Sequence, residues 1–225
     1  MKKNILILSL ILVLFCASLI LIGCGTTNSN IKNNISDIRI GVFDGKNNDY
    51  FASFVYGERE EPYKEDGISN KRVDFGIISV SFNEKQTKTT FSFKLVLENE
   101  TIEGELEKNP YSKEFMADIG KQINTENQIK LIVYIDENES ETTLNKKSTN
   151  FEIDANSAFE IGKEGLKDEI SNMQKKDKCE FYLKIISDNN IAEGKYFWMF
   201  SVVCKNGEKH NIIFSTDSDE ILVKN

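Results

Sequence analysis

The chain is expected to fold as an α+β protein, with a β-rich, sandwich-like part followed by one helix and a three-stranded antiparallel sheet. Two observations predict this class. Between residues 37 and 135, short stretches of alternating apolar and polar residues are separated by clusters of Gly, Asn and Asp, which is typical of a β-sandwich. The last 75 residues instead begin with a helical pattern and continue with three apolar stretches of strand length.

The N-terminal stretch has the features of an export signal. Lys2 and Lys3 precede residues 5–22, which carry no charge, and the run closes with Leu21-Ile22-Gly23-Cys24. This stretch resembles a bacterial lipoprotein signal peptide with its lipobox, which implies removal of residues 1–23 and attachment of lipid to the Cys24 thiol. An uncleaved membrane anchor is the alternative, because these 18 uncharged residues approach the length of a spanning helix.

Both interpretations place the rest of the chain on the extracytoplasmic face of the cell membrane. Residues 24–35 are polar and without periodicity, and they predict a flexible tether. The chain after residue 23 has a formal charge of −10, since the whole chain has −8 and the removed part contains two lysines. This charge argues against nucleic acid as a partner. The expected partners are the membrane, through the lipid on Cys24, and an unknown envelope protein or small ligand.

Residues 36–146 are predicted to form the β-rich domain. Its clearest strand is 89–97, in which Phe91, Phe93 and Leu95 alternate with polar residues, and Glu98-Asn99-Glu100 then predicts a hairpin turn. The predicted strands are 37–43, 50–56, 73–82, 89–97, 101–106 and 128–135.

Residues 109–123 have two interpretations. Asn109-Pro110 is a suitable helix start, and apolar residues then recur every four positions from Tyr111. The alternative is a strand through Phe115, Ala117 and Ile119 that continues the sandwich.

Residues 136–150 are polar, without apolar periodicity, and predict a linker between two domains. In the second domain, 151–225, Asp154 can cap a helix with Phe159 and Leu166 on its apolar face. Strands are predicted at 179–186, 196–204 and 209–216, and Asn206-Gly207 predicts the turn between the last two.

This element order, the Asn206-Gly207 turn and the closing segment 217–221 resemble the PepSY-like and cystatin-like modules, in which a curved antiparallel sheet wraps one helix. The resemblance covers 151–225 and implies a regulator or inhibitor of peptidases.

Two cysteines remain once Cys16 leaves with the signal and Cys24 takes the lipid. Cys179 and Cys204 lie on adjacent predicted strands, in a compartment that permits disulfides. A loop centred on 190–191 places Val202 opposite Cys179 and leaves Cys204 on the diagonal, which is too far for a bond. A register shifted by one step would pair them directly, so a disulfide and two buried thiols are both open.

The charged loop 57–67 is the most distinctive surface stretch. Its carboxylates could contact a partner or hold Ca²⁺ through hard oxygen ligands, although their spacing is not that of an EF-hand, and most acidic loops are only solvated. These candidate residues are Glu58, Glu60, Glu61, Glu65 and Asp66. The second acidic stretch, 136–141, is interpreted as linker.

No catalytic residue, metal site or cofactor is assigned. The chain contains one histidine, His210, so histidine-based zinc sites and Ser-His-Asp chemistry are disfavoured. A Cys204–His210 dyad would need an exposed thiol, and Cys204 ends an apolar strand; Trp198 is interpreted as core. The main hypothesis is a non-catalytic binding module at the cell envelope. The alternatives are the peptidase regulator and a carboxylate-only enzyme such as a glycosidase.

Overall fold

The computed structural model describes residues 31–225 except 124–125, 137, 188–190 and 193. The expected signal peptide, Cys24 and the start of the tether lie outside the described residues. The chain up to Asn34 and residues 35–225 form two separate units, and of the first unit only the helical turn at 31–34 is described. None of the helices in the described part is long and apolar enough to cross a membrane.

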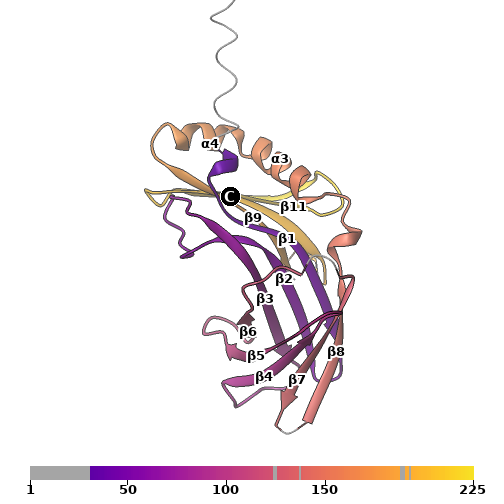
Figure 1. The fold of residues 1–225 in the computed structure, drawn as a ribbon. Coiled ribbons are helices and arrows are strands. Elements are labelled where there is room, and N and C mark those ends of the chain that lie inside the picture. Colours follow the sequence, from indigo (N-terminus) through magenta and orange to yellow (C-terminus); the bar gives the residue numbers. More distant parts are fainter. Residues whose placement is uncertain (1–30, 124–125, 137, 188–190, 193) are drawn as a thin grey trace, which may run out of the picture. The chain divides into compact units, whose positions relative to one another are not determined.

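Eight of the described strands close into an antiparallel barrel (Figure 1). Their order around the barrel is β1-β2-β3-β6-β5-β4-β7-β8, and β8 returns to β1 at Phe43↔Lys146 and Asp44↔Asn145. The α+β class with a sandwich is therefore wrong, and the fold is mainly β. The barrel strands are β1 (Ile35–Lys46), β2 (Tyr50–Glu60), β3 (Arg72–Phe82), β4 (Thr90–Val96), β5 (Thr101–Lys108), β6 (Phe115–Asp118), β7 (Gln128–Ile135) and β8 (Asn138–Lys146).

Strand β1 is shared between the barrel and a second group of strands. Its first residues pair in parallel with β9 (Cys179–Ser187), for example Ile38↔Leu183, and its later residues pair with β8. The register of β1 against β2 shifts between Arg39 and Gly41, and such a bulge bends a strand and increases its twist. One bent strand can therefore serve two neighbours in succession along the same edge. A sandwich of two separate sheets would leave such edges open.

The barrel interior is a packed core. Inward-facing side chains of its strands form one buried cluster, as alternation along each strand requires. Phe82, Phe91 and Phe115 meet near one end, with ring centroids 4.5 to 5.4 Å apart. The buried aromatic members of the cluster are Phe43, Tyr50, Phe54, Tyr56, Phe91, Phe93 and Phe115.

Two ambiguous stretches belong to the barrel. The interpretation of 136–150 as a linker is wrong, because β8 and the short helix η1 (Ser148–Asn150) occupy most of it. The inner face of β8 carries Ser140, Thr142 and Leu144, so small polar residues replace the apolar alternation. The hydroxyl of Tyr50 donates to the Ser140 carbonyl at 2.9 Å. Within 109–123 the strand interpretation is confirmed by β6 and the helix is wrong.

The C-terminal part contains the predicted elements in the predicted order. The helix is split at Leu166 into α3 (Ala155–Gly165) and α4 (Lys167–Gln174), and the Asp154 side chain caps it by accepting from the Ser157 amide at 2.7 Å. The strands β10 (Tyr196–Cys204) and β11 (Lys209–Ser215) follow β9, and β12 (Ile221–Lys224) adds an edge strand. In Figure 1 the helices lie over one face of these strands.

The likeness of this part to a separate PepSY-like or cystatin-like sheet does not hold, because β9 continues into the barrel through β1. All twelve strands of the described residues form one sheet. The division into domains 36–146 and 151–225 stays a prediction.

Candidate functional site

The predicted acidic stretch lies in a network of polar contacts, some of them buried, that joins it to strands β1 and β9. Residues 57–60 end strand β2, and the following loop connects β2 to β3. We call residues 61–71 the clamped loop. It lies against the face of β9 that carries Glu180, Tyr182 and Lys184. The opposite face of β9 packs under the helices, where the rings of Phe181 and Phe200 stack with their centroids 6.1 Å apart.

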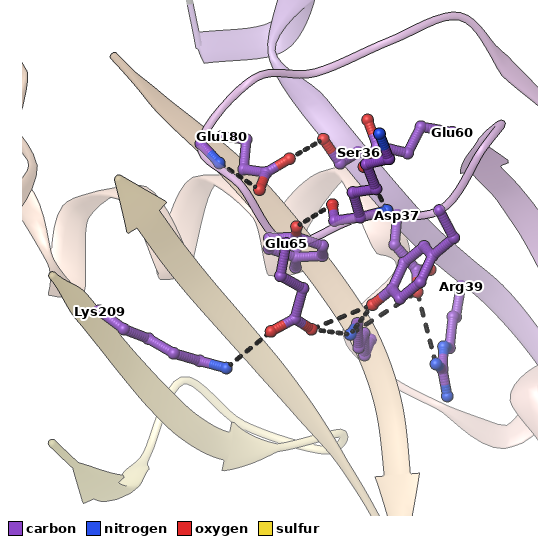
Figure 2. A network of polar contacts seen from close by, with 12 residues as sticks. Ser36, Asp37, Arg39, Glu60, Glu65, Glu180 and Lys209 are labelled. Carbon is purple, nitrogen blue, oxygen red and sulfur yellow. Dashed lines mark hydrogen bonds and ion pairs between the residues drawn. The ribbon is translucent and has the colours of Figure 1, made fainter. Parts of the chain in front are cut away.

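Glu180 binds the tip of the clamped loop, which is Gly67. Its side chain is fully buried, and its carboxylate accepts from the Ser36 hydroxyl at 2.6 Å and from the Gly67 amide at 2.7 Å (Figure 2). Two residues further along β9, the Tyr182 hydroxyl donates to the Lys64 carbonyl at 3.2 Å. A buried carboxylate is stable only when hydrogen bonds replace its hydration, so these contacts stabilise β1, β9 and the loop together.

Lys184 is a buried cation under the same loop. Its Nζ donates to the Tyr63 hydroxyl at 2.9 Å and lies 3.7 Å from Asp37 Oδ2 and 3.6 Å from Glu65 Oε1. The ammonium also lies 4.7 Å from the centre of the Tyr182 ring, as in a cation–π contact. Burial lowers the pKa of Lys184, and the nearby carboxylates of Asp37 and Glu65 oppose this shift only in part.

Glu65 links the network to the C-terminal strands. Its carboxylate pairs with Lys209 of β11 at 3.2 Å and accepts from the Tyr63 hydroxyl at 3.1 Å (Figure 2). Burial works to raise the pKa of Glu65, but the cations of Lys184 and Lys209 outweigh it and the pKa is lowered. Burial raises the pKa of Tyr63, so this phenol stays protonated and can donate its hydrogen bond.

The remaining predicted acids serve the loop and its two flanking strands. Glu58 pairs with Arg72 at 3.1 Å, and the buried Glu60 accepts from the Lys64 and Asn70 amides at 3.1 and 2.8 Å. Asp66 accepts from the Ile68 amide at 3.1 Å. The described residues contain no group of three or more His, Cys, Asp or Glu side chains that could hold a metal ion.

A groove of about 630 Å³ lies beside the clamped loop. Four of its lining residues are acidic and one is basic, which gives it a formal charge of −3. The basic residue, Arg59, pairs with Asp118 and lies 5.1 Å from the centre of the Phe75 ring. The lining residues are Arg59, Glu60, Glu61, Pro62, Tyr63, Val73, Asp74, Phe75, Asp118 and Gly120.

Cys179 and Cys204 form a disulfide. The two cysteines lie directly opposite each other in the β9–β10 ladder, and Val202 faces Phe181. The register expected from a loop centred on 190–191 is therefore wrong, and the register shifted by one step is present. Of the two interpretations, the structure has the disulfide, and a Cys204–His210 dyad has no thiol to use.

Other singled-out residues lie away from this network. Trp198 is buried, and its indole N–H donates to the Ile153 carbonyl at 3.0 Å. His210 Nδ1 lies 3.2 Å from the Asn225 carbonyl oxygen. In the second acidic stretch, Asp136 lies in the turn after β7, and residues 138–141 belong to β8.

Sequence reasoning missed the β9 side of the site. The signal was present: Glu180, Tyr182 and Lys184 place a polar group at every second position of an otherwise apolar strand. Such a period marks one face that packs against polar partners. Ser36 and Asp37 carried no comparable signal, because they stand at the junction with the expected tether.

Comparison of the chain with protein-family models, with curated proteins and with solved structures finds no match.

Proposed function

We propose that this chain is a lipid-anchored protein of the extracytoplasmic membrane face that acts as a non-catalytic interaction module. Its contact surface is the clamped loop together with the neighbouring acidic groove, and its partner is an envelope protein with a basic patch. The observation that carries this proposal is a loop that is hydrogen-bonded to β9 and still exposes Tyr63, Ile68 and Glu61 to solvent.

A fixed, exposed loop suits recognition for a thermodynamic reason. Ordering a mobile loop on binding costs free energy, and a loop held in advance avoids that cost. Glu180, Tyr182 and Lys184 hold this loop from below. Tyr63 and Ile68 are 41% and 40% exposed, so apolar area remains for a partner on a surface that is already ordered.

Charge supports a basic partner. The groove carries a formal charge of −3, and the whole chain carries −8. Complementary potentials steer association and select partners. Glu61 lies in the loop and Asp74 on β3, so the two carboxylates approach the groove from separate elements.

Two further observations support the extracytoplasmic location. The residues 1–24 resemble a lipoprotein signal, and the Cys179–Cys204 disulfide suits an oxidising compartment. A diacylated Cys24 would supply two acyl chains, which is enough for stable anchoring.

The anchor is tested with Cys24→Ser in the full chain expressed in bacteria. We expect the unchanged chain to enter the detergent phase and the membrane fraction, and the variant to leave both. Cys16→Ser is the matched control, because this residue lies inside the apolar run and should leave anchoring intact. Equal membrane retention of the Cys24→Ser and unchanged chains would favour an uncleaved anchor instead.

The contact surface is tested by capture from envelope extracts. We expect specific partners to bind the chain at low salt, and binding to weaken in the double variant Glu61→Gln/Asp74→Asn and at high salt. The matched control is Glu105→Gln/Glu107→Gln, which removes the same charge from exposed positions of β5. Equal capture by both double variants would refute this contact surface.

A further inference from the structure

The Cys179–Cys204 disulfide lies next to the strand end that the clamped loop contacts. Cys179 is the first residue of β9 and Cys204 is the last residue of β10, so the bond closes the ladder at its open end. Just beyond it, the Lys205 amide donates to the Lys178 carbonyl at 3.0 Å. The ends of a ladder are where strands open most easily, and a covalent link at this position holds both ends together.

The tip of the clamped loop contacts both sides of this strand end. Gly67 has φ of +78°, and a Cβ built on it would lie 2.2 Å from the Lys205 nitrogen and 2.7 Å from the Cys204 carbonyl carbon. Its amide donates to Glu180, the residue after Cys179. The loop tip therefore lies against the backbone of Cys204 and Lys205 on one strand and against the Glu180 carboxylate on the other.

We propose that the Cys179–Cys204 disulfide is a redox control of the clamped loop, which is held while the bond is intact and released when it is reduced. Reduction by a dithiol transfers two electrons. One thiolate of the reductant attacks a cysteine sulfur, its second thiol resolves the mixed disulfide, and two protons complete the Cys179 and Cys204 thiols while the reductant becomes a disulfide. The freed strand ends then move apart, and the Gly67 amide loses the fixed carboxylate that accepts its hydrogen bond.

The consequence for binding rests on the proposed function, whereas release of the loop does not. The experiment therefore reads the loop directly, by amide hydrogen exchange on the full chain in detergent, oxidised and after reduction with dithiothreitol. Alkylation of the peptides that contain Cys179 and Cys204 confirms the extent of reduction. The reference segment is β7, which lies in the barrel away from β9.

We expect exchange in residues 61–71 to become about tenfold faster or more on reduction, the change that loss of one hydrogen bond to a charged group produces. Exchange in β7, read at labelling times too short for global unfolding, should stay unchanged. Confirmed reduction with no change in 61–71 would overturn the proposal. Equal acceleration in 61–71 and β7 would also overturn it, because that result means general loosening of the fold.

A variant at Gly67 tests the contact of the loop tip with the strand end while the Cys179–Cys204 disulfide stays intact. Gly67→Ala places a methyl group against the Lys205 backbone, so it should accelerate exchange in 61–71 although the disulfide is intact. Unchanged exchange in this variant would mean that the contact of Gly67 with the Cys204 and Lys205 backbone does not hold the loop, and this would overturn the proposal. If reduction releases the loop but capture of the partner is unaffected, the redox control stands and the proposed contact surface fails.

Discussion

Reduction of the Cys179–Cys204 disulfide is expected to lower the free energy of unfolding by about 3.5 kcal/mol. The bond closes a loop with a sequence separation of 25 residues. In the chain-entropy account, a loop of this length removes about 12 cal/mol/K from the unfolded state, and multiplication by 298 K yields that free energy. The magnitude depends only on loop length, so it can be stated before any measurement.

Thermal unfolding followed by circular dichroism measures this effect. For a unit of this size, each kcal/mol shifts the midpoint by about 2 to 4 °C, so the reduced chain should unfold about 7 to 14 °C below the oxidised chain. Reduction of the unchanged chain keeps both sulfur atoms in the core. This comparison therefore isolates the covalent bond from the cavity that truncation would leave.

The control is the double variant Cys179→Ala/Cys204→Ala, whose midpoint should not respond to the reductant. A response of the double variant would mean that dithiothreitol acts elsewhere in the chain. The reasoning is refuted if the unchanged chain shows the same midpoint in both states, with both cysteines alkylated in the reduced sample.

Three further predictions concern buried groups. Burial raises the pKa of Tyr50 and of Tyr182, so above pH 10 the unfolded chain loses protons that the folded chain keeps. The free energy of unfolding should therefore fall by up to about 1.4 kcal/mol per pH unit for each phenol. Denaturation experiments that show no change of stability with pH in this range would contradict the prediction. Burial lowers the pKa of Lys184 from its ordinary value of 10.5. Between the lowered pKa and 10.5 the unfolded chain binds a proton that the folded chain lacks, so the free energy of unfolding should rise with pH in this range. In Lys184→Met, denaturation at a series of pH values should no longer show this rise. Gly162→Ala would place its Cβ 2.3 Å from Phe200 Cγ. The overpacking should cost about 2 kcal/mol, which exceeds the roughly 1 kcal/mol gained in helix propensity, so the variant should be less stable. A higher thermal midpoint in this variant would show that the helix can shift to accept the methyl group.

Local pattern predicted most of the individual elements. Three of the four described strands of the C-terminal part match their predicted positions to within one residue. Cys179–Ser187, Tyr196–Cys204 and Lys209–Ser215 correspond to the predictions 179–186, 196–204 and 209–216, whereas β12 (Ile221–Lys224) is not predicted as a strand. Alternation shows which side chains share a face, and this depends only on the geometry of a single strand. The same rule failed for β8, where Ser140 and Thr142 face inward, because polar residues at inner positions give no hydrophobic period.

The sequence by itself determined the positions of most strands, the capped helix and the charge of the exposed loop. Only the tertiary structure decided that the strands close into a barrel through Phe43↔Lys146. It also decided the register that joins Cys179 to Cys204 and the clamp in which Ser36 reaches Glu180 across 144 residues. The physical reason is that periodicity reports the environment of each strand separately. The choice of neighbour depends on packing and hydrogen bonds between residues that are distant in the chain, and no local pattern contains them.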